Sequence, residues 1–94
     1  MIDFAVSERV TMVLPIRVDR VDTSLIGCTL TLEVPGNTGT LGESIALTVE
    51  TYRGVLAVAP GDFAVGEYLA HVIYQHGAVG PVNSRQFPIV VYAG

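Results

Sequence analysis

Apolar and polar residues alternate at every second position through most of the chain, a pattern that predicts β-strands rather than helices. The clearest example is segment 10–18. One of its faces is entirely apolar and consists of Val10, Met12, Leu14, Ile16 and Val18. Pro15 lies on the other face and has no N–H to donate to a neighbouring strand. We therefore expect this strand to have an unpaired edge or a bulge at Pro15.

Six further segments alternate in the same way or are continuously apolar, and turn residues separate them. They are 2–6, 28–34, 45–50, 55–59, 66–75 and 85–92. Segments 35–40 and 76–81 are rich in glycine and proline, which predicts an exposed turn and a hairpin loop. No segment has the helical period. Seven strands in a single domain of residues 1–94 predict an all-β fold, namely an immunoglobulin-like antiparallel β-sandwich.

The strand at 66–75 contains the sharpest local motif. Gly66 comes two residues before Tyr68 at the start of this strand. In many β-sandwiches a tyrosine at this position packs its ring in the core, while its hydroxyl donates to a carbonyl of the preceding loop. We expect Gly66 and Tyr68 to form such a corner, with Ala70 and Val72 on the same core face as Tyr68.

The opposite face of the same strand carries Leu69, His71 and Ile73. In the final strand, Val90 and Tyr92 alternate with the expected core positions. If the two strands are neighbours, these five residues share an outer face that is largely apolar. An apolar patch of this kind indicates contact with a partner. The alternative is that segment 35–43 folds over the patch.

The composition favours the partner interpretation and excludes some others. Charged residues make up 15% of the chain, compared with about 25% in typical globular domains. The net charge is -4 and the five cations are scattered arginines, so we expect no binding to nucleic acid. No apolar run is long enough to span a membrane and no basic amphipathic helix is present, so we expect no membrane contact. Residues 1–4 do not resemble the start of a secretory signal.

No residues combine into a catalytic or metal-binding motif. His71 and His76 are five residues apart, which places their side chains on opposite faces of a strand. This arrangement is wrong for binding one metal ion. Cys28 is the only cysteine, so an internal disulfide is impossible. The serines do not lie in a nucleophile elbow. We predict that the protein is not an enzyme and uses no cofactor or metal.

The order of these features resembles a known family. Segment 10–18 is followed by a polar loop, by Leu25-Ile26-Gly27, by a strand at 29–34, and later by Gly66-Glu67-Tyr68 and a final strand. This arrangement resembles the small immunoglobulin-like domains of tailed-bacteriophage virions, including the N-terminal domain of baseplate upper proteins. Immunoglobulin domains proper have a cysteine two residues after the corner tyrosine, where this chain has Ala70. The disulfide-bonded class is therefore excluded.

The resemblance implies a structural protein of the virion that is assembled in the cytoplasm of the host bacterium. We expect a subunit that decorates or cements the head, because the chain is a single domain without the shaft or coiled coil of baseplate versions. The major capsid protein is then the favoured partner, and self-association into a homo-oligomer stays open. A tail or baseplate component is the second interpretation. A carbohydrate-binding adhesion module is the third, although the chain has no Trp and only Tyr52 and Phe63 as aromatic residues near predicted loops.

Overall fold

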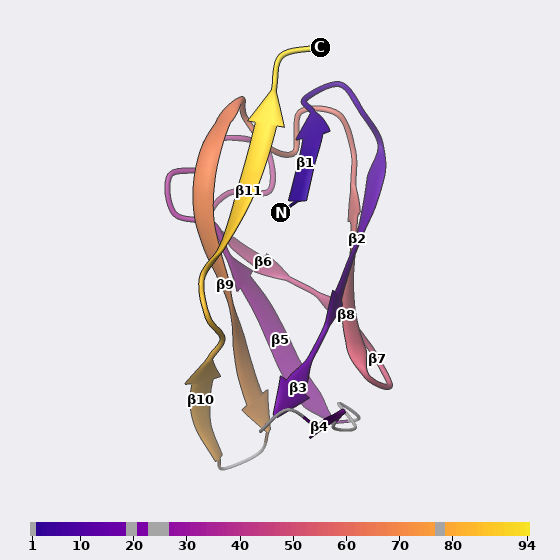
Figure 1. Cartoon of the computed structure of the whole chain (residues 1–94), viewed down its shortest axis with the longest axis vertical. Helices are drawn as coiled ribbons and strands as arrows, with labels where there is room; N and C mark the ends of the chain where they lie inside the picture. The colour runs from indigo at the N-terminus through magenta and orange to yellow at the C-terminus, as the bar shows by residue number, and fades with distance from the viewer. Residues whose placement is uncertain (1, 19–20, 23–26, 77–78) are drawn as a thin grey trace.

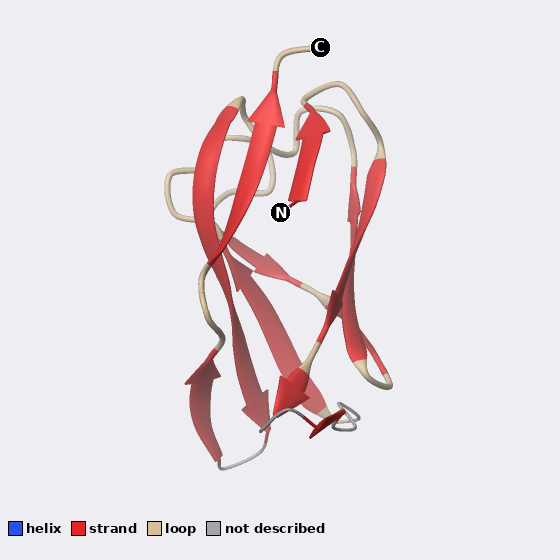
Figure 2. Ribbon diagram, viewed as in Figure 1, coloured by secondary structure: helices blue, strands red, loops and turns tan. Residues whose placement is uncertain are grey.

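A computed structural model describes residues 2–18, 21–22, 27–76 and 79–94, and these residues form strands and loops but no helix (Figure 2). The strands are β1 (Ile2–Ala5), β2 (Val10–Pro15), β3 (Arg17–Val18), β4 (Val21–Asp22), β5 (Cys28–Glu33), β6 (Ser44–Ala46), β7 (Thr48–Glu50), β8 (Arg53–Val58), β9 (Gly66–His76), β10 (Val79–Asn83) and β11 (Phe87–Tyr92).

The strands form two facing sheets (Figure 1). The larger sheet has the order β1-β11-β9-β5-β6, and β10 also pairs with β9. The smaller sheet has the order β2-β8-β7, and β3 and β4 form a separate two-stranded ribbon. In Figure 1 the strands β2, β8 and β7 lie on the right and β9 and β11 on the left. The expected all-β sandwich is confirmed.

The core lies between the sheets and is built from the inward positions of each strand, because successive side chains of a strand point to opposite faces. The predicted core face of segment 66–75 is buried, and so are alternate residues of β11: Tyr68, Ala70, Val72, Ile89 and Val91. The largest fully buried side chain is Phe63, from the loop between β8 and β9. Its ring makes edge-to-face contacts with Phe4 and Tyr68, at centroid distances of 5.6 and 6.4 Å.

The structure has more and shorter strands than the seven expected, because two predicted strands are interrupted and because β4 and β10 form outside the predicted segments. Segment 10–18 divides at Ile16, whose N–H donates to the Tyr52 carbonyl at 3.1 Å. Segment 45–50 divides at Leu47, whose N–H donates to Leu30 on β5 at 3.0 Å, while the next residue begins β7 in the facing sheet. The alternation continues through both bends, so it does not reveal them. Strand β2, which carries Pro15, lies at an edge of its sheet.

One pair of strands departs from the antiparallel arrangement of the others, and one expectation about a loop was wrong. The sandwich is not wholly antiparallel, because β1 pairs with β11 in parallel, with Ile2 opposite Ile89. Segment 76–81 is not simply a hairpin loop, because β10 pairs with the end of β9, with Val82 opposite Tyr74. The register of this pair shifts between Val79 and Val82. A shift of this kind accommodates the Gly-Pro dipeptide within a strand, since proline cannot donate to a regular ladder.

The prediction of an exposed turn at 35–40 was wrong at Asn37, which is 3% exposed. The Asn37 Nδ2 donates to the carbonyls of Gly42 at 2.8 Å and of Asp62 at 3.3 Å. The Asn37 Oδ1 accepts from the N–H groups of Gly39 at 3.0 Å and of Ala64 at 3.1 Å. A buried amide is stable where its donors and acceptor are all satisfied in this way. Asn37 therefore closes its own loop and joins it to the loop between β8 and β9.

Backbone contacts reinforce this joint between the two loops. The N–H of Thr40 donates to Gly61 at 3.1 Å, and the N–H of Leu41 donates to Asp62 at 3.2 Å. Gly39 lies so close to the second loop that a Cβ there would overlap the Asp62 carbonyl and come within 2.8 Å of the Ala64 nitrogen. The approach of the loops therefore requires glycine at position 39.

We predict that Asn37→Ala lowers the free energy of unfolding by about 2–4 kcal/mol, because it leaves backbone groups of both loops without hydrogen-bond partners. Urea unfolding followed by circular dichroism measures this loss. Thr38→Ala is the matched control, because Thr38 is the exposed neighbour and its truncation should change stability by no more than about 0.5 kcal/mol. Equal stability of the two variants would contradict the role given to Asn37.

Candidate functional site

The start of β9 is held by a tyrosine corner. The Tyr68 hydroxyl donates to the carbonyl of Ala64 at 2.6 Å, while its ring is buried against Phe63. Gly66 has a φ of 157°, and a Cβ at this position would lie 3.3 Å from the Tyr68 hydroxyl oxygen. A side chain at position 66 would therefore crowd the hydroxyl. The structure places Gly66 and Tyr68 in the arrangement that the corner motif requires.

Ala64 connects this corner to the joint made by Asn37. Its carbonyl accepts from Tyr68 and its N–H donates to Asn37, so both backbone groups of Ala64 are held by side chains from outside its loop. Tyr68 belongs to β9 and Asn37 to the loop after β5. The start of β9 is thereby fixed to the loops at one end of the sandwich.

The structure places the five predicted contact residues at outward positions of the larger sheet. Leu69 and Tyr92 are 53% and 48% exposed, whereas His71, Ile73 and Val90 are half-buried. The pairing of β9 with β11 brings Leu69 and Val90 to neighbouring positions. His71 and Ile73 lie further along β9, where they pair with β5 instead. The structure therefore groups Leu69, Val90 and Tyr92 at one end of the face and separates them from Ile73.

A residue that the sequence prediction did not include completes this group. Pro88 is exposed and lies directly opposite Leu69 in the β9–β11 ladder. Leu69, Pro88 and Val90 line a shallow hollow of about 370 Å³, together with Glu67 and Tyr68. The alternation of β11 already put Pro88 on this face, but only the register shows that it meets Leu69. We call Leu69, Pro88, Val90 and Tyr92 the outer patch.

Segment 35–43 does not cover the outer patch. It is bound instead to the loop between β8 and β9, through Asn37 and through the backbone of Thr40 and Leu41. Leu69 and Tyr92 therefore keep about half of their surface exposed. The alternative in which this segment folds over the face is not what the structure shows.

A polar row borders the outer patch on the side of β5. His71 on β9 lies opposite Glu33 on β5, and Glu33 lies opposite Ser44 on β6. The Ser44 hydroxyl donates to the Glu33 carboxylate, with its oxygen 2.8 Å from Oε1 and 2.9 Å from Oε2. This row separates Leu69 from Ile73 and marks the limit of the apolar surface.

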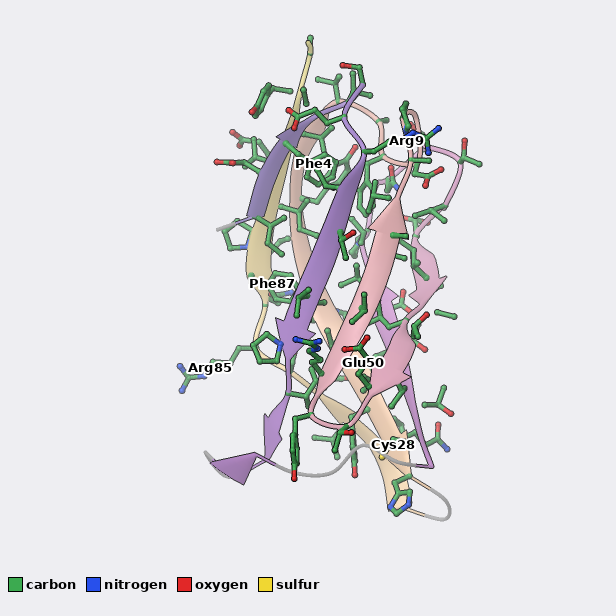
Figure 3. The ribbon with its side chains drawn as sticks, turned by 90° about the vertical axis from the view of Figure 1, so that its right-hand side faces the viewer. Phe4, Arg9, Cys28, Glu50, Arg85 and Phe87 are labelled. Atoms are coloured by element: carbon green, nitrogen blue, oxygen red, sulfur yellow. The ribbon has the colours of Figure 1, made fainter. Side chains whose placement is uncertain are left out.

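The opposite end of the sandwich has a larger hollow of about 810 Å³, lined by Gly27, Cys28 and the turn between β7 and β8. Figure 3 shows Cys28 at this end, far from Phe4. Arg53 pairs with Glu50 on the turn. A hydrogen bond with Cys28 raises the pKa of the Tyr74 hydroxyl. In the part of the chain that the structure describes, no three His, Cys, Asp or Glu side chains gather as a metal site.

No protein-family model matches the chain, and no curated protein or solved structure gives a significant match. Leu25 and Ile26, which belong to the motif that carries the phage resemblance, lie outside the described residues. The described residues form no helix that is long and apolar enough to cross a membrane. The function is therefore inferred from the residues and their geometry.

We predict that Tyr68→Phe lowers the free energy of unfolding by about 1–2 kcal/mol at neutral pH, because the half-buried Ala64 carbonyl loses its donor. Tyr52→Phe is the matched control, since the Tyr52 ring is 52% exposed and should contribute little. Thermal unfolding of the three proteins measures the difference. An unchanged midpoint for Tyr68→Phe would show that the hydroxyl bond contributes nothing to stability.

The difference in stability between the wild type and Tyr68→Phe should depend on pH. Burial raises the pKa of the Tyr68 hydroxyl above its ordinary value of 10.0. Because the folded pKa exceeds the unfolded one, the stabilisation is fully present below the unfolded pKa and is lost as pH rises through the folded pKa. The advantage of the wild type over Tyr68→Phe should therefore shrink above about pH 10. An advantage that stays constant into this range would contradict the assignment.

Proposed function

We propose that this chain is a non-enzymatic structural protein of a bacteriophage virion, and that it decorates or cements the head by binding the major capsid protein. The observation that carries the binding role is the outer patch, where Leu69 and Tyr92 stay about half exposed on the outward face of the larger sheet. The place in the virion is supported by the resemblance to phage immunoglobulin-like domains.

The amount of apolar surface at this end of the sheet supports a contact. Val65, one residue before β9, is 54% exposed and adds to the apolar surface beside Leu69 and Tyr92 at the end of the β9–β11 pair. Full burial of a large apolar side chain contributes about 1.5–3 kcal/mol, so covering the exposed half of each contributes about 1 kcal/mol. Several such side chains on one surface favour association with a partner.

The fixed position of the patch also favours binding. Three of its residues lie on β11, which is paired on both sides by β1 and β9, and the fourth lies on β9. The inner faces of these strands are buried in the core. Strands held in this way lose little conformational freedom when a partner binds, so the entropic cost of binding is small.

Quantitative mass spectrometry of phage particles purified from the bacterium that produces this chain tests the proposal. The chain should stay with the particles, at a copy number commensurate with the capsid lattice. A handful of copies per particle would assign it to the tail or baseplate instead. Its absence from the particles would refute the virion role.

In the same assay, Leu69→Ser should reduce the occupancy of the particles about fivefold to tenfold, because the contact loses the larger part of one apolar side chain. Val13→Ser is the matched control. Val13 is 46% exposed on β2 in the facing sheet, so its loss should leave occupancy unchanged. Equal losses in the two variants would show that the outer patch is not the contact surface.

A further inference from the structure

Two acidic residues, Asp3 and Glu67, border the outer patch, and we call them the acidic frame. The apolar pattern alone does not show them. In the strand register, Val90 on β11 has Asp3 of β1 on one side and Glu67 of β9 on the other. Both carboxylates belong to exposed residues, whereas Val90 between them is half-buried. Val90 is therefore an apolar position with a negative charge on each side.

These two carboxylates have no partner among the residues that the structure describes. The described ion pair joins Arg53 and Glu50, which lie on the turn between β7 and β8. Glu33, the next acid on the same face, is bound by Ser44 rather than by a cation. Among the described residues, the charge of Asp3 and Glu67 is therefore open to a ligand from outside.

We propose that the outer patch binds an extended segment of another protein in which an apolar residue has arginine or lysine two residues before it and two residues after it. The apolar side chain occupies the hollow between Leu69, Pro88 and Val90, and the flanking cations pair with Asp3 and Glu67. This inference rests on the proposed function for the location of the contact and adds the chemistry of the partner. For a head-decorating subunit, it describes the contact segment of the capsid protein.

The spacing of the frame fits such a segment. Neighbouring strands lie about 4.8 Å apart, so Asp3 and Glu67, which are two strands apart, are separated by about 10 Å. Residues i, i+2 and i+4 of an extended chain point to the same side, and the outer two are about 14 Å apart. Arginine side chains are long enough to close the remaining distance, and their guanidinium groups bind carboxylates well.

The acidic frame also argues against a second copy of this chain as the occupant. A symmetric dimer through the outer patch would place the same surface on both sides of the interface. The row of Asp3 and Glu67 in one copy would then meet the same row in the other. Juxtaposed like charges of this kind repel each other and suppress the pairing.

Titration of the ¹⁵N-labelled protein with short peptides, followed by NMR, tests the proposal. The probe is the capped peptide Gly-Arg-Gly-Leu-Gly-Arg-Gly, in which the leucine and both arginines point to the same side of an extended chain. Its matched controls are Gly-Glu-Gly-Leu-Gly-Glu-Gly, which reverses the charge, and Gly-Arg-Gly-Ser-Gly-Arg-Gly, which removes the apolar side chain. The probe should shift the amide signals of residues 67–69 and 88–90, bind at least about fivefold more tightly than either control, and weaken as salt is added.

Substitutions in the protein test whether the charges of Asp3 and Glu67 contribute to the affinity for the probe. Asp3→Asn combined with Glu67→Gln should weaken binding of the probe about threefold to tenfold. Glu43→Gln combined with Glu50→Gln changes the net charge equally at other places and should leave the affinity unchanged. Equal binding of the acidic peptide, an unchanged affinity in the first double variant, or shifts centred on β2 and β8 would overturn the proposal.

Two outcomes separate this inference from the proposed function. If the peptides do not bind while Leu69→Ser still releases the protein from particles, the cationic partner is refuted and the proposed function stands. Concentration-dependent dimerisation that shifts the same amide signals would identify a second copy as the occupant and would also overturn the inference. The titration itself needs no particle, so its result does not depend on the copy-number assay.

Discussion

The hydrogen bonds that hold Ala64 position the rest of the larger sheet. Its N–H is bound by the buried Asn37 amide and its carbonyl by the Tyr68 hydroxyl, so one residue joins two loops to the start of β9. The neighbouring Phe63 ring fills the core against Phe4 and Tyr68. Strand β9 then pairs with β11, β5 and β10. A shift at Ala64 would therefore move the strand on which three neighbours depend.

The two faces of β9 therefore have different structural roles. The inner face is packed in the core through Tyr68, Ala70 and Val72, while the outer face presents Leu69 to solvent beside Pro88 of β11. Because the inner side chains and the corner fix the strand, the outer patch and its acidic frame keep their positions without a partner. In the proposed function, this pre-organised surface is the part of the molecule that makes the contact.

Alternation was sufficient to predict the all-β sandwich and the two faces of β9, and the motif Gly66-Glu67-Tyr68 predicted the corner. Each of these depends on residues close in sequence. The features that were missed depend on residues far apart. Asn37 is buried because Asp62 and Ala64, 25 and 27 residues later, supply its partners. The pairing of Leu69 with Pro88, the flanking of Val90 by Asp3 and the parallel addition of β1 all follow from register, which alternation leaves undetermined. The change of sheet at Leu47 is hidden because the periodicity continues through it.

The central claim is that Asn37 and Tyr68 act on β9 through the same residue, and a double-mutant cycle of Asn37→Ala and Tyr68→Phe tests it most directly. The free energy of unfolding of the four proteins would be measured by urea denaturation. If both side chains hold Ala64 as one unit, the double variant should lose at least about 0.5 kcal/mol less than the sum of the two single losses. Additivity within about 0.3 kcal/mol would show that the two bonds act independently, and would contradict the account.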